Sequence, residues 1–247
     1  MKKLVFCNRR GGCGKTVTAY NVAYNLATLH RKRVLVVDSD PQGTLTAAVG
    51  ATPAKGNLYT AIKAGSLAGN IQTVAGFDLL AAADELEAVN LAPDTLDKLL
   101  EQAAGKYDLV VMDTQPANNA ITAAAIFAAD LVFVTSTADK YALAGVVKSV
   151  AQMVALRKMG AKFKVGGLIL TNYESRGILY GSMAAGLDTL AGEIGTTVLK
   201  PAIRKGIAAA ESMATEQALE AYEPKSKPAQ DYRELTKTIL KVIKKGE

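Results

Sequence analysis

Six consecutive residues near the start of the chain, Gly11-Gly12-Cys13-Gly14-Lys15-Thr16, have the composition of a phosphate-binding loop. They follow a short apolar run, Leu4–Cys7, and precede a segment with helical spacing. Glycines let a strand-to-helix turn direct several backbone N–H groups at one anion, and the helix N-terminus adds partial positive charge. In such a loop the lysine reaches the terminal phosphates and the threonine hydroxyl coordinates Mg²⁺. The segment therefore predicts a nucleotide site.

The match to the usual P-loop pattern is incomplete. That pattern places a glycine five positions before Gly14, where this chain has Arg9. An ordinary glycine-rich turn is the alternative interpretation. The position between an apolar run and a helix, together with acidic segments further along the chain, favours the phosphate site.

Two acids follow a second apolar run. Val34–Val37 is short and mostly β-branched, which is typical of a strand buried on both faces of a parallel sheet, and it leads into Asp38-Ser39-Asp40-Pro41-Gln42-Gly43. Ligands of open α/β sheets bind at the carboxyl ends of the strands, so these acids and the loop should face one crevice. There a carboxylate holds Mg²⁺-bound water or orients an attacking water. The alternative is that Asp38 and Asp40 only cap a turn.

A third segment, Tyr107–Thr114, is an apolar strand that ends in a single acid, Asp113. This is the Walker-B arrangement, in which the carboxylate supports the Mg²⁺ shell. Taken alone the pattern is weak, but it gains weight because it follows a phosphate-binding loop by about a hundred residues.

Strand-like and helix-like segments alternate along the whole chain. This alternation predicts a single domain over residues 1–247 with a doubly wound α/β fold, a mostly parallel sheet and helices on both faces. Pro93 should divide one long helical segment, and residues 224–228 form a polar break. The expected strands are 4–7, 34–37, 71–74, 77–82, 107–113, 131–134, 165–170 and 196–199; the expected helices are 16–29, 57–65, 84–104, 121–129, 141–159, 178–194, 207–221 and 230–245.

Positive charge is concentrated in the two ends of the chain. The net charge is +6, with eight basic and two acidic residues in 1–50, six and eleven in 51–156, and fifteen and ten in 157–247. An anionic partner such as nucleic acid or a membrane surface fits this pattern, and a generally basic surface is the alternative. The two cysteines suggest no disulfide framework, so we expect a cytoplasmic protein.

These segments resemble the ParA/MinD family of P-loop ATPases. Arg10–Thr16 is similar to the family's deviant Walker-A loop, Asp38–Gly43 to its Asp-x-Asp-Pro-Gln-Gly segment, and Tyr107–Thr114 to its Walker-B strand. Ala128–Asp130 and Tyr141–Gly145 match two further family segments, and Tyr222–Lys227 with Tyr232–Leu235 resembles the ParA C-terminal signature. The resemblance spans nearly the whole chain and is nearest to small ParA proteins without an N-terminal helix-turn-helix.

The resemblance implies an ATPase that forms a homodimer with ATP and Mg²⁺ sandwiched at the interface. The dimer would bind DNA non-specifically on the nucleoid, and a ParB-like or other small adaptor protein would stimulate slow hydrolysis. The cargo would be a plasmid, a chromosome origin or a protein compartment. The implied nucleotide-binding residues are Arg10, Gly11, Gly12, Cys13, Gly14, Lys15, Thr16 and Val17, with Asn172 at the adenine; the implied catalytic residues are Asp40, Lys15 and Arg10; the implied Mg²⁺ residues are Thr16, Asp38 and Asp113; and the implied DNA contacts are Lys200, Arg204 and Lys205.

One residue departs from the family pattern. The family has a signature lysine at the position of Arg10, where it reaches the nucleotide of the partner subunit. Arginine stays charged and binds phosphate oxygens in a bidentate manner, so it can take the same role or act as an arginine finger. The competing hypothesis is that Lys140 supplies the missing lysine.

Two other functions compete with a DNA-binding switch. In a MinD-like switch, the basic closing helix would lie on a membrane surface, with Leu235, Ile239, Val242 and Ile243 opposite its lysines. Packing of that helix on the domain is the favoured alternative, so we expect no stable membrane anchoring. A metabolic enzyme on this scaffold, such as an iron–sulfur reductase or a ligase-like synthetase, is also disfavoured. The reductase needs cluster cysteines downstream of the loop, which are missing, and no extra acid/base constellation points to a small-molecule substrate.

Overall fold

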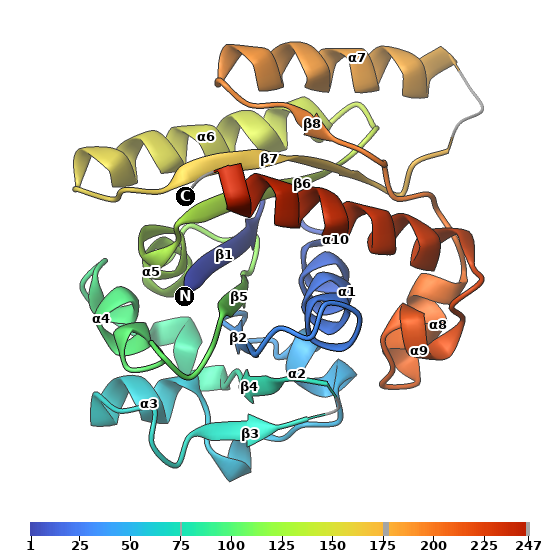
Figure 1. The fold of residues 1–247 in the computed structure, drawn as a ribbon. Helices are drawn as coiled ribbons and strands as arrows, with labels where there is room; N and C mark the ends of the chain where they lie inside the picture. The colour runs from blue at the N-terminus through green and yellow to red at the C-terminus, as the bar shows by residue number, and fades with distance from the viewer. Residues whose placement is uncertain (75, 175–177, 246–247) are drawn as a thin grey trace.

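The computed structural model describes residues 1–74, 76–174 and 178–245. Within them the strands form one eight-stranded sheet in the order β3-β4-β2-β5-β1-β6-β7-β8 (Figure 1). All neighbouring strands are parallel except the pair β3 and β4. The mostly parallel, doubly wound α/β sheet expected from the sequence is confirmed. The strands are β1 Lys2–Cys7, β2 Val34–Asp38, β3 Ile71–Thr73, β4 Asp78–Leu80, β5 Leu109–Asp113, β6 Leu131–Thr137, β7 Lys164–Thr171 and β8 Val198–Leu199.

Helices cover both faces of the sheet, because the central strands are apolar on both sides. One core packs α3, α4, α5, α6 and α7 against one face, and a second core packs α1, α2, α8, α9 and α10 against the other. The helices are α1 Lys15–Thr28, α2 Thr44–Ala48, α3 Leu58–Ala64, α4 Thr95–Glu101, α5 Ala120–Ala128, α6 Ala142–Lys158, α7 Ile178–Glu193, α8 Ala208–Ala214, α9 Leu219–Tyr222 and α10 Lys227–Lys245, with 3-10 turns η1 Pro53–Lys55 and η2 Asp84–Ala88.

The closing helix α10 lies alongside α1 across one face of the sheet (Figure 1). Three residues of its apolar stripe, Leu235, Ile239 and Ile243, are buried in the core, and Val242 packs against that core. The stripe that a membrane would need is therefore occupied by the domain itself. Among the described residues, no helix combines the length and apolar character that a membrane span requires.

Two expected helices are shorter than the sequence suggested. The segment 84–104 is divided before Pro93, as expected, but it forms only the turn η2 and helix α4, because Val89 adopts an extended backbone and Pro93 disfavours a helical residue before it. The segment 207–221 is split into α8 and α9, and the backbone N–H of Leu219 donates to Asn21 Oδ1 at 2.8 Å instead of to a helical carbonyl. Helix α2 was not expected, and α10 begins at Lys227, within the expected polar break.

Candidate functional site

The loop between β1 and α1 is held in the shape that phosphate binding requires. Gly12 and Gly14 adopt left-handed φ angles of 72° and 74°. A Cβ on Gly14 would lie 3.3 Å from the Thr171 side chain, so this glycine is needed for close packing as well as for its backbone angle. The Asn8 side chain braces the start of the loop, donating to Thr135 O at 2.6 Å and accepting from Arg10 N at 3.0 Å.

Lys15 and Cys13 both face the inside of this loop. Lys15 is buried, and its ammonium donates to the carbonyl of Arg10 at 3.2 Å, so it bridges the loop that phosphates would fill. The Cys13 thiol is fully buried, donates to the same carbonyl at 3.1 Å and accepts from Thr135 Oγ1 at 3.4 Å. Cys13 is thus a small residue that packs inside the loop, and Lys15 supplies the positive charge of the loop.

Asp38 and Asp113 lie next to each other at the carboxyl ends of β2 and β5, where the register pairs them directly. Asp38 Oδ2 accepts hydrogen bonds from the backbone N–H and hydroxyl of Thr46, at 2.8 and 2.7 Å. Burial is the main cause that raises the pKa of Asp38, to about 6. Burial and the charge of Asp38 also raise the pKa of Asp113, against Thr16 and Lys15, which lower it.

This pair of acids fits a cation at the phosphate loop. Asp113 Oδ2 is buried without a hydrogen-bond partner, and a nearby positive charge would relieve the repulsion between the two carboxylates. Among the described residues, no three His, Cys, Asp or Glu side chains gather into a ready-made metal site. Mg²⁺ is commonly held by only one or two carboxylates plus substrate phosphates, which matches this arrangement.

The segment after β2 positions its second acid, Asp40, at the same edge. The Asp40 N–H donates to Asp38 Oδ1 at 3.2 Å, and Asp40 Oδ1 accepts from Gln42 N at 3.0 Å. Ser39 donates from both its backbone N–H and its hydroxyl to the carbonyl of Asp113. These bonds join the ends of β2 and β5, so the two acidic segments form one unit beside the loop.

The predicted adenine contact, Asn172, follows β7 directly and has a left-handed φ of 51°. It lines a groove of about 690 Å³ that runs from the phosphate loop toward α8 and α10. Gly12, Gly14 and Val17 line the loop end of this groove, and Ile203, Ile207 and Met213 are among the apolar residues beyond. The groove begins at the phosphate loop and offers a base an apolar wall.

The three predicted DNA contacts lie in different surroundings. Arg204 is bound to Asp231 of α10 through its backbone N–H at 2.9 Å, Nε at 2.8 Å and Nη2 at 2.7 Å. Lys205 lines the groove and pairs with Glu174 at 2.8 Å. Lys200 follows β8, and its carbonyl accepts from Thr238 Oγ1 at 2.8 Å. Arg204 thus joins the loop after β8 to α10.

Sequence reasoning missed the partners that hold the site residues. Thr46 holds Asp38, Thr171 Oγ1 donates to the carbonyl of Cys13 at 3.0 Å, and Asp139 holds Arg10 at 2.6 Å. The available signal was the position of these polar residues at the carboxyl ends of strands, Asp139 just after β6 and Thr171 at the end of β7. Lys140, the proposed substitute lysine, lies over the Tyr141 ring at 4.7 Å.

Comparison with known proteins gives consistent matches. A family model described as an AAA domain matches residues 1–164. The chromosome-partitioning ATPase Soj of Thermus thermophilus is 32% identical over 245 residues, covering 97% of this chain and 96% of Soj. The structure of apo McdA from Cyanothece has a TM-score of 0.87 at 22% identity, covering 97% of this chain and 99% of McdA. Cobyrinic acid a,c-diamide synthase from Mycobacterium smegmatis with bound ADP and magnesium has a TM-score of 0.81 at 25% identity, covering 100% and 97%.

Proposed function

This chain belongs to the ParA/MinD family of P-loop ATPases, and we propose that its ATP-bound form is a dimer that binds DNA without sequence preference. It is a partitioning or positioning ATPase that uses ATP and Mg²⁺. The observation that supports the proposal most is the phosphate loop set beside two neighbouring acidic segments. Segments that contact a terminal phosphate are a common switch element, because they are ordered when that phosphate is present and released when it is lost.

We assign the hydrolysis roles by position. Lys15 and the N–H groups of the loop hold the phosphates, and Thr16, Asp38 and Asp113 support the Mg²⁺ shell. When bound, Mg²⁺ neutralises charge on the β- and γ-phosphates. Asp40 orients the water that attacks the γ-phosphorus; the bond to the bridging oxygen breaks, and ADP and phosphate leave.

The groove beside the loop supports a place for the nucleoside. Asn172 presents an amide at the rim, and the apolar residues Ile203 and Met213 provide surface on which a base can pack. The carboxyl edge of the sheet would then be covered by nucleotide and by a second subunit. Arg10, whose side chain is 31% exposed at this edge, is the residue proposed to reach the nucleotide of that subunit.

The cargo-handling part of the proposal follows from the relatives. Soj is named as a chromosome-partitioning ATPase. For this chain we propose association with nucleoid DNA, stimulation by a ParB-like or other small adaptor protein, and movement of a plasmid, a chromosome origin or a protein compartment. The alternative of a membrane-surface switch is not favoured, because the apolar stripe of α10 is buried against the domain.

The test uses fluorescence anisotropy with two unrelated DNA duplexes. Asp40→Ala should retain ATP without turnover, so its ATP-bound form should bind both duplexes with equal affinity, at least about tenfold tighter than the ADP-bound form. Binding should weaken steeply with salt, because phosphate contacts release counterions. Lys15→Ala is the matched control, which should show no response to ATP. Equal DNA affinity with ATP and with ADP, or a strong preference for one duplex, would contradict the proposal.

A further inference from the structure

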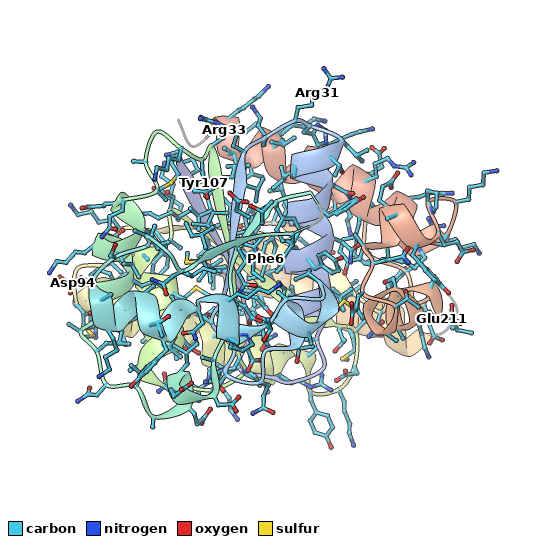
Figure 2. All side chains as sticks on the ribbon, turned by 90° about the horizontal axis from the view of Figure 1, so that it is seen from below. Phe6, Arg31, Arg33, Asp94, Tyr107 and Glu211 are labelled. Carbon is cyan, nitrogen blue, oxygen red and sulfur yellow. The ribbon has the colours of Figure 1, made fainter. Side chains whose placement is uncertain are left out.

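The edge of the sheet opposite the phosphate loop carries a row of cations. They lie at the starts of four strands, in segments that are distant in the sequence. Figure 2 shows Arg33 at this edge beside Tyr107, with Arg31 projecting beyond the ribbon. We call this set the basal row: Lys2, Lys32, Arg33, Lys106, Lys162 and Lys164.

Backbone hydrogen bonds show that the row is continuous. Asp108 N donates to Arg33 O at 2.8 Å, and Lys2 N donates to Asp108 O at 3.0 Å, which joins the starts of β2, β5 and β1. On the other side, Asp130 N donates to Lys3 O at 2.8 Å and Lys164 N to Asp130 O at 2.9 Å. The starts of β2, β5, β1, β6 and β7 therefore form one line.

Three adjoining hollows run along this line. The first, about 540 Å³, is lined by Lys32, Arg33 and Lys106, among others. The second, about 430 Å³, shares Lys32 and Arg33 with the first and adds Lys2. The third, about 160 Å³, shares Lys2 and adds Lys162 and Lys164. Because neighbouring hollows share these cations, the three hollows adjoin along the row, and the shared side chains stand between them.

Three acids lie near the six cations of the row, and among them only Asp108 has an ion pair with a described residue, because Asp78 and Asp130 accept from neutral donors. Asp108 pairs with Arg33 at 2.7 Å, Asp78 accepts from the Tyr107 hydroxyl at 2.8 Å, and Asp130 accepts from Lys3 N at 2.7 Å. Within the described part of the chain, Lys32, Lys106 and Lys162 are exposed and form no ion pair. The row thus keeps a positive excess for an external anion.

The pKa of a neighbouring histidine, His30, is lowered in part by this positive charge. Burial lowers the pKa of His30 first, and the charges of Lys237 and Lys32 lower it further. Lys237 belongs to α10, and Lys244 of the same helix lines the second hollow. The basic face of α10 therefore extends the positive region.

We propose that the basal row is a docking surface for the phosphate backbone of double-stranded DNA, on the edge of the sheet that faces away from the nucleotide. This inference rests on the proposed DNA binding and assigns it a surface different from Lys200, Arg204 and Lys205. From β2 to β7 the row crosses four strand spacings, or roughly 19 Å. Duplex DNA presents one charge per about 1.7 Å of axis, so several phosphates fit along such a length.

An anionic membrane is the other polyanion to consider. Stable attachment there needs an apolar face or lipid anchor in addition to a basic patch. The apolar stripe of α10, the amphipathic helix closest to the row, is buried. A basic surface with adjoining hollows and no exposed apolar stripe matches a DNA backbone better than a bilayer.

The experiment compares two charge-matched triple variants with the wild type. The basal variant carries Lys32→Glu, Lys106→Glu and Lys162→Glu; the control carries Lys55→Glu, Lys63→Glu and Lys148→Glu, at exposed positions that line none of the three hollows. Affinity for an unrelated duplex is measured with ATP and Mg²⁺ over a series of salt concentrations. Binding of a fluorescent ATP analogue reports folding, because the row is at the far edge of the sheet.

The basal variant should bind the duplex at least about tenfold more weakly than the control and should bind the ATP analogue normally. Its salt slope should be smaller by about 0.9 for each DNA phosphate that the protein no longer neutralises. Duplex binding equal to that of the control would refute the basal row as the DNA-binding surface. It would not contradict the proposed DNA binding by the ATP-bound dimer. Loss of binding to vesicles containing phosphatidylglycerol, with duplex binding unchanged, would identify a membrane surface instead and also overturn it. A wild type that binds no duplex with ATP would refute the proposed function as well.

Discussion

Arg10 and Asp139 form an ion pair within one subunit. Nη1 of Arg10 lies 2.6 Å from both carboxylate oxygens of Asp139, and the same nitrogen donates to Thr137 Oγ1 at 3.1 Å. The Arg10 guanidinium also stands over the Tyr141 ring at 5.7 Å. The side chain proposed to reach a partner's nucleotide is therefore held by the segment between β6 and α6 of its own chain, and it must leave Asp139 to act across an interface.

Removing the charge of Asp139 should favour the dimer. Asp139→Asn keeps an acceptor for the Tyr141 N–H but weakens the hold on Arg10. The pair is partly exposed, with 31% and 40% of the two side chains accessible, so releasing it should strengthen ATP-dependent dimerisation by about two- to fivefold. Analytical ultracentrifugation with ATP measures this. Arg10→Ala should abolish the dimer; if Lys140→Ala abolishes it and Arg10→Ala does not, Lys140 is the interface cation.

Gly14→Ala should remove nucleotide binding and destabilise the fold. Alanine at a φ of 74° costs about 1–2 kcal/mol, and its Cβ would press on Thr171 at 3.3 Å. Gly65→Ala is the matched control, because Gly65 has a φ of 60° with no atom within 4 Å of the added Cβ. Thermal unfolding should show the backbone cost in both variants and a further loss in Gly14→Ala from the contact with Thr171. ATP titration should show a binding loss only in Gly14→Ala. Normal ATP affinity in Gly14→Ala would argue against this loop geometry.

Breaking the contact between Arg204 and Asp231 should lower the stability of the fold. The Asp231 side chain is only 7% exposed and accepts three hydrogen bonds from Arg204. Asp231→Asn should lower the free energy of unfolding by about 1–3 kcal/mol in urea titrations. Glu174→Gln, which breaks the exposed pair with Lys205, should change it by less than about 0.5 kcal/mol. Equal effects of the two substitutions would contradict the structural role of Arg204.

Asp108 makes stability depend on acid pH. Hydrogen bonding from Arg33 is the main cause that lowers the pKa of Asp108 from 3.8 to about 2. A carboxyl group whose pKa is lower in the folded state stabilises the fold above its unfolded pKa, so this contribution is complete above about pH 4 and is lost as the pH falls toward 2. The stability difference between wild type and Asp108→Asn should therefore shrink over that interval in urea titrations at pH 6, 4, 3 and 2. A stability difference that is constant over this pH range would mean that folding does not change the pKa of Asp108.

The placement of the candidate site was predictable because it depends on short local segments. The phosphate loop follows β1, and Asp38 and Asp113 are the last residues of β2 and β5. Parallel strands bring their carboxyl ends to one edge of the sheet. The α/β class followed from the same alternation. Burial of the apolar stripe of α10 agrees with the favoured expectation that this helix packs on the domain.

The rest depends on contacts between distant residues. Asp139 lies 129 positions after Arg10, and the Asn21 side chain that helps to separate α8 from α9 lies 198 positions before Leu219. The charge count assigned the basic excess to the two ends of the chain, and the fold brings Lys2, Lys32 and Lys162 of these ends to one edge, which the count does not indicate. No local pattern encodes these pairings, because they arise from the order of the strands in the sheet.

The most direct test of the switch is the mass of the Asp40→Ala variant by size-exclusion chromatography with light scattering, in ATP and Mg²⁺ and separately in ADP and Mg²⁺. The proposed mechanism predicts twice the monomer mass with ATP and the monomer mass with ADP. A single mass in both nucleotides, whether monomer or dimer, would contradict it.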